Sequence, residues 1–197
     1  MYKEDKMRKL LQFLFILAVG VFCCACVNTF AVHELNEKAY KYIEEGDNEA
    51  AISRLEASVD LDGDLYETRY NLANIYLSTN KCDKAVVHAE HAAKLKKNEP
   101  IIHYVLGLAA TCAADDIYEQ NKPKQENNSG YYGGYYGQKQ AQSTMNERAL
   151  SAYLDYLNKA NTALNAYLQI VPQAEDAQRV ADIVKDNENK IETHSKG

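Results

Sequence analysis

The residue types that most often carry chemistry are histidines, cysteines and carboxylates, and two short clusters of them stand out. His88 and His91 flank Glu90 in the string HAEH. The glutamate does not directly follow the first histidine, so the string lacks the HExxH spacing of a helical zinc site. The string DLDGD at 60–64 starts like a calcium loop but lacks the glutamate that closes such a loop. We interpret both clusters as charged helix faces or helix ends and expect no metal site.

No other pattern in the sequence indicates catalysis or nucleic-acid binding. Asp115 and Asp116 are adjacent carboxylates, which we also interpret as helix-end charge. The sequence has no GxSxG nucleophile motif and no glycine-rich phosphate loop. Its 22 Lys and Arg against 28 Asp and Glu give a formal net charge of −6, which disfavours binding to phosphate backbones. We therefore expect a protein that is not an enzyme, needs no cofactor and binds no nucleic acid.

After Val32, similar residues recur every 34 positions along the sequence, which indicates repeated structural units. A small residue early in each unit would let a second helix approach closely, and an aromatic residue beside it would fill the wedge between the helices. The matched positions are Ala39, Ala73 and Gly107, then Tyr42, Tyr76 and Ala110, and in the second half-unit Ala51 and Ala85. The pattern is typical of closely packed helices.

This pattern resembles the tetratricopeptide repeat, a helix–turn–helix unit of the same length. The resemblance implies an all-α fold, a solenoid of about three repeats followed by a capping helix with a polar outer side. The expected domain covers 32–172, and the capping helix and a short tail follow it. The boundaries are about 32–65, 66–99 and 100–172 for the repeats, 173–192 for the capping helix and 193–197 for the tail.

The turn residues agree with this division. Gly46 would end one helix, and Asp47 or Asn48 would cap the next. Asn80 stands in the place of that glycine in the second unit, and Pro100 suits the first turn of a third. The third unit is interrupted at about 120–143 by a stretch rich in Tyr, Gly, Asn and Gln, which cannot bury a core and is expected to be a loop. After it, Thr144 to Glu147 form a capping-box pattern for a long helix that Pro172 ends.

The resemblance also implies a concave groove lined by the first helix of each repeat. The positions carried over to this groove are Asn36, Tyr40, Tyr70, Asn71, Asn74, Tyr104 and Leu108. Only Asn71 agrees with the carboxylate clamp that some family members use for chaperone tails, so we expect that activity to be missing. Tyrosine rings, amides and aliphatic side chains suit an extended peptide or an amphipathic helix. Tyr70 and Tyr104 equally fit a second interpretation, in which they pack between repeats.

The N-terminus resembles a bacterial lipoprotein signal. A charged segment at 1–9 precedes an apolar run at 10–22, and CCAC follows at 23–26. Cys26 after Ala25 is the expected lipidation site, with Cys24 as the second candidate. The 23 residues without a formal charge from Leu10 to Val32 also fit a retained transmembrane anchor, and a plain secretory signal is a third possibility. All three place the remainder of the chain outside the cytoplasm, where Cys82 and Cys112 could form a disulfide.

Together these features predict a non-catalytic adaptor of the bacterial cell envelope, anchored to the membrane at its N-terminus. Its partner would be a protein or peptide that lies in the groove. The alternative is a structural envelope protein that contacts glycan or peptidoglycan through the YYGGYYG stretch, where tyrosine rings could stack on sugars.

Overall fold

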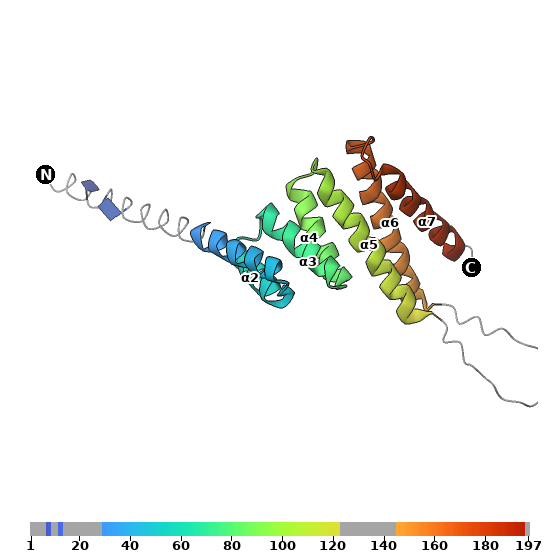
Figure 1. The fold of residues 1–197 in the computed structure, drawn as a ribbon, viewed down its shortest axis with the longest axis horizontal. Helices are drawn as coiled ribbons and strands as arrows, with labels where there is room; N and C mark the ends of the chain where they lie inside the picture. Colours follow the sequence, from blue (N-terminus) through green and yellow to red (C-terminus); the bar gives the residue numbers. More distant parts are fainter. Residues whose placement is uncertain (1–6, 9–11, 14–28, 123–144, 196–197) are drawn as a thin grey trace, which may run out of the picture.

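The computed structural model describes residues 7–8, 12–13, 29–122 and 145–195, and this part of the chain is built from helices and short turns. Residues 29–45 are helical, and successive helix pairs then follow one another along the long axis of the molecule (Figure 1). The remaining helices are α2 (Asn48–Leu61), α3 (Tyr66–Ser78), α4 (Cys82–Leu95), α5 (Pro100–Asn121), α6 (Glu147–Ile170) and α7 (Ala177–Ser195). The expected all-α, tetratricopeptide-like solenoid is confirmed.

The turns inside the first two helix pairs are made in the same way. Gly46 has a φ of 77° and Asn80 a φ of 55°, so both residues adopt the left-handed conformation that ends a helix. After the first of these turns, the carboxylate of Asp47 accepts a hydrogen bond from the backbone N–H of Ala50 and caps α2. Pro100 occupies the first turn of α5, where its missing N–H costs nothing.

Small residues hold the two helices of each pair close together. Ala39 and Ala73 have no exposed surface, and neither do Ala51 and Ala85 opposite them. Tyr76 is 1% exposed and fills the wedge beside Ala73, while its hydroxyl donates to Glu56 of α2. The small and large residues that recur in the sequence therefore form the contact surface between the paired helices, as expected from close packing.

The third helix pair is longer than the first two, and α6 begins later than the capping-box pattern predicted. Asn146 is the N-cap of α6, since its side chain accepts from the backbone N–H of Ala149 at 2.9 Å. Thr144, the predicted cap, lies outside the described residues. Because the helix starts at Glu147, that glutamate lies in the first turn, where the helix dipole favours negative charge. It therefore does not occupy the third position that a capping box requires.

The capping helix α7 extends the solenoid beyond the third pair, and the apolar core continues into it. Leu164 and Tyr167 of α6 form an apolar cluster with Val180 and Val184 of α7. In the middle of α7 the polar side chain of Asn187 is also fully buried. The helix runs from Ala177 to Ser195, so it includes most of the predicted tail.

Two predicted segments lie wholly or mostly outside the described residues. Cys24 and Cys26 belong to one of them, and the Tyr/Gly-rich insertion belongs to the other, although α5 continues to Asn121 and so includes its first two positions. Within the described part of the chain, no helix combines the length and the apolar character that crossing a membrane requires.

The two helices of the third pair approach each other closely at Gly107. A Cβ atom added to Gly107 would lie 2.4 Å from the Cγ and Cδ2 atoms of Leu164, which is fully buried. We expect Gly107→Ala to lower the free energy of unfolding by up to about 2 kcal/mol, because overpacking costs ~1–3 kcal/mol and helix propensity returns only ~1 kcal/mol. Urea denaturation of the variant measures this change.

The matched control is the double variant Gly107→Ala/Leu164→Ala. Shortening Leu164 alone leaves a cavity, but in the double variant the new methyl group enters the vacated space. We expect the double variant to lose less stability than the sum of the two single losses. Strict additivity would contradict the steric explanation.

Candidate binding groove

The three ionisable residues of the HAEH string each contact different neighbours. The Nη1 atom of Arg69 lies 3.2 Å from Nδ1 of His88, whose ring stacks on Tyr76. His91 Nε2 lies 2.9 Å from an oxygen of Asp64. Glu90 forms an ion pair with Lys159 of α6. His88, Glu90 and His91 therefore connect α4 to other parts of the fold, and their side chains do not point toward a common site.

The environment of His88 favours its neutral form. Burial of the ring, and then the cation of Arg69, lower the pKa of His88 to about 4. A neutral imidazole nitrogen accepts a hydrogen bond from the Arg69 guanidinium, which also donates to the carbonyl of Gly63 at 2.8 Å. His88 thus fixes the turn between α2 and α3 to α4.

Cys82 and Cys112 form a disulfide that joins α4 to α5, with their Cα atoms 5.7 Å apart. This separation lies within the range that a disulfide needs. An oxygen of Asp116 is close to both sulfur atoms, and these three residues are the group in the described chain that could hold a metal ion. Because metals bind the thiolate, a disulfide removes two of the three ligands.

Asn36, in the helix of residues 29–45, contacts both α2 and α3, and the nitrogen and the oxygen of its amide both form hydrogen bonds. Its Nδ2 donates to the Val32 carbonyl at 2.9 Å and to Ser58 Oγ at 3.0 Å. Its Oδ1 accepts from Thr68 Oγ1 at 3.0 Å. Ser58 and Thr68 are fully buried. The structure thus gives Asn36 hydrogen bonds within the fold, and its expected ligand contact stays a prediction.

Four of the predicted groove residues form a surface at the first-helix layer of repeats one and two. Tyr40, which is 45% exposed, accepts a hydrogen bond from Asn71 Nδ2 at 2.9 Å. Tyr70 is half-buried and stacks on Tyr66 one turn away, with 5.9 Å between ring centres. Asn74 Nδ2 donates to the Tyr70 carbonyl at 2.9 Å. We call Tyr40, Tyr70, Asn71 and Asn74 the tyrosine–amide surface.

Tyr104 lies further along this layer and contacts the capping helix. Its hydroxyl accepts from Arg179 Nη2 at 2.6 Å, and its ring lies 5.3 Å from that of Tyr167. Arg179 also pairs with Asp176 at 3.4 Å, and Asp176 accepts a hydrogen bond from the Tyr167 hydroxyl at 2.6 Å. That hydrogen bond is the main reason why the pKa of Tyr167 is raised to about 12. Arg179 and Asp176 were not predicted as site residues, since the repeat pattern gives them no matched position.

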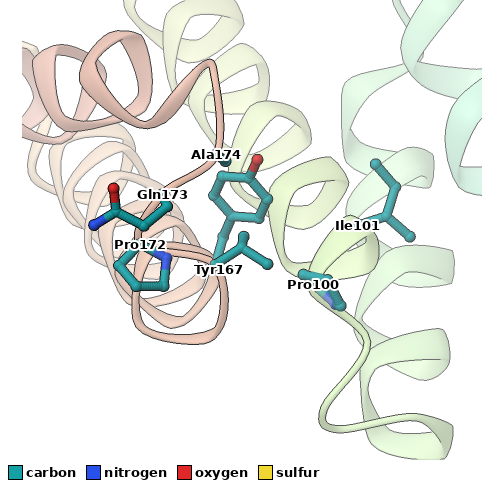
Figure 2. A pocket seen from close by; sticks show the side chains of 7 residues that line it. Pro100, Ile101, Tyr167, Pro172, Gln173 and Ala174 are labelled. Carbon is teal, nitrogen blue, oxygen red and sulfur yellow. The ribbon is translucent and has the colours of Figure 1, made fainter.

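Leu108, the last predicted groove residue, lines an open cavity. That cavity has a volume of about 580 Å³ and lies between α5 and α7. Another open cavity, of about 500 Å³, is mainly apolar and lies where α5 begins and α6 ends. Figure 2 shows Tyr167 there, between Pro172 and Gln173 of the α6–α7 turn and Pro100 and Ile101 of α5.

The fold and this layered arrangement define the class, an all-α tetratricopeptide-like solenoid. The tetratricopeptide repeat family matches residues 42–109. Among solved structures, the chain is similar to the Arabidopsis OM64 TPR domain at 14% identity and a TM-score of 0.53. The similarity covers 81% of this chain and 98% of that domain. No curated protein matches the chain.

The disulfide between α4 and α5 gives a prediction for the mature protein. Peptide mapping without reductant, on protein alkylated while unfolded, should recover the Cys82 peptide linked to the Cys112 peptide. The link closes a segment with a sequence separation of 30 residues. Cys82→Ala/Cys112→Ala should therefore lower the free energy of unfolding by about 3 kcal/mol.

The control is reductant, which should lower the melting temperature of the wild-type protein and leave that of the double variant unchanged. Two alkylated cysteines at these positions in the mature protein would show that the bridge does not form.

Proposed function

We propose that this chain is a non-catalytic adaptor that binds a segment of a partner protein along the concave face of its repeats. The observation that carries the proposal is the tyrosine–amide surface on the first-helix layer of a tetratricopeptide-like fold. Such arrays use this layer for protein binding, because stacked first helices line one continuous groove. The fold supports the general role of protein–protein interaction, and the residues supply the proposed site.

The chemistry of this surface suits a peptide backbone. Asn71 and Asn74 each use an amide N–H within the fold, on Tyr40 and on the Tyr70 carbonyl. In the described chain no hydrogen bond reaches their Oδ1 atoms, so each can accept one from a ligand N–H. The rings of Tyr40 and Tyr70 add contact area with little loss of side-chain entropy.

The test compares two asparagines whose contacts match. Asn74→Ala should reduce recovery of the partner in a crosslinking pull-down from membranes by about three- to tenfold, the effect of one lost hydrogen bond. Its melting temperature should stay close to that of the wild type, because the lost bond is made within a single helix. Quantitative mass spectrometry of the captured proteins measures the recovery.

Asn158→Ala is the matched control. Asn158 Nδ2 also donates to a carbonyl one turn earlier, that of Leu154 at 2.9 Å, but it is exposed on α6. Equal recovery with both variants would contradict groove binding. A large fall in the melting temperature of Asn74→Ala would instead identify Asn74 as a structural residue.

In the same proposal the chain is a lipoprotein of the bacterial cell envelope, with Cys26 as the lipidated residue and Cys24 as the second candidate. The charged and apolar segments before these cysteines support it. The Cys82–Cys112 disulfide is also consistent with an oxidising compartment. The glycan-binding alternative depends on the YYGGYYG stretch, which lies outside the described residues, and no described contact favours it.

Lipidation at Cys26 predicts a defined mass. Intact-mass analysis of the detergent-extracted protein should show loss of residues 1–25 and gain of acyl groups, and Cys26→Ser should accumulate as the unprocessed precursor. Cys24→Ser serves as the comparison and should be processed normally. If neither substitution changes the product, the lipoprotein proposal fails and the N-terminus is a retained anchor or an ordinary secretory signal.

A further inference from the structure

The cavity between α5 and α7 has an apolar floor. Leu108 of α5 and Ile183 of α7 are both half-buried and line it, and the half-buried Cys112 of the disulfide lies beside them. Of the area lining the cavity, most is apolar. Its volume of about 580 Å³ is sufficient for one or two side chains of a bound segment. We call this site the α5–α7 furrow.

The rim of the furrow carries more negative than positive charge. Four aspartates line it, and its two cations are Arg179 and Lys190. Lys190 forms ion pairs with two of the aspartates, Asp115 at 3.2 Å and Asp186 at 3.0 Å. Arg179 pairs with Asp176, which is outside the lining, and donates to the Tyr104 hydroxyl. The two cations are thus already engaged within the fold.

The other two aspartates of the rim, Asp116 and Asp182, have no cationic partner among the described residues. Asp182 accepts a hydrogen bond from the neutral amide of Gln178 at 3.0 Å. Both carboxylates are exposed. Two uncompensated negative charges beside an apolar floor attract cations and repel carboxylates.

We propose that the α5–α7 furrow binds a basic segment of the partner, in which an apolar side chain is flanked by Lys or Arg. The apolar side chain lies on Leu108 and Ile183, and the cations face Asp116 and Asp182. This inference rests on the proposed function and specifies the chemistry of the partner. It also excludes acidic tails, because their carboxylates would face the same two aspartates.

The direct test uses two labelled synthetic peptides of equal length, which differ only in having Lys or Glu on both sides of a Leu anchor. Fluorescence anisotropy with the full chain in detergent measures their binding. The Lys peptide should bind and the Glu peptide should not. Asp116→Asn/Asp182→Asn should weaken binding of the Lys peptide by roughly three- to tenfold, and added salt should remove most of that difference.

The matched control is Asp60→Asn/Asp155→Asn, which removes the same charge from exposed positions on α2 and α6. It should bind the Lys peptide as the wild type does, so that attraction to the net charge of the whole chain is separated from binding in the furrow. Equal binding of the two peptides, equal weakening by both double variants, or no binding of the Lys peptide would each overturn the inference.

The crosslinking pull-down separates this inference from the proposed function. If recovery of the partner depends on Asn74 but is unchanged by Asp116→Asn/Asp182→Asn, groove binding stands and the basic segment is wrong. If recovery depends on neither, the proposed function fails as well. Recovery that falls with both sets of substitutions supports both proposals.

Discussion

The constraint on which this structure depends is the distance between paired helices, which small side chains set. At Gly107 the neighbouring helix comes so close that even a methyl group has no room, and Ala39 and Ala73 have no exposed surface. The same close approach places the large side chains beside these positions, such as Tyr76 and Leu164, in fully buried sites. Since each pair is held in this way, the first helices form one layer, and the proposed binding surfaces lie on that layer.

Buried polar contacts add to this packing by fixing how successive first helices are aligned. Asn36, Ser58 and Thr68 connect three helices, and Asn187 connects three others through Thr111 and Asn161. Burying such groups is costly unless they are hydrogen-bonded, so a shifted alignment would leave them unsatisfied. Asn187 Oδ1 illustrates the cost, because it is buried and accepts no hydrogen bond from the described residues. The apolar contacts hold the helices together, and these networks specify one alignment.

The sequence predicted those features that depend on nearby residues or on the repeat itself. Gly46, Asn80 and Pro100 occupy helix ends at which their residue types are favoured, so the sequence predicts these ends directly. The small residues recur at a fixed spacing. For Asn36 and Tyr104, the position in the repeat predicts a place on the groove but not the contacts within the fold. Their partners, Thr68 and Arg179, lie 32 and 75 residues away in the chain, and no local pattern connects them. Asn146 was missed as a cap because Thr144, two positions earlier, also fits a capping pattern.

The contacts between α5 and α7 show how the capping helix extends the layer of first helices. Tyr104 with Arg179, Thr111 with Asn187, and Asp115 with Lys190 are separated by 75, 76 and 75 residues. Because the separation is nearly constant, the two helices run in the same direction, and their residues stay in the same register along their length. Successive first helices of a solenoid have this relation, so α7 occupies the place of a fourth first helix. The layer of first helices therefore continues past the third repeat, and the α5–α7 furrow lies on the same layer as the tyrosine–amide surface.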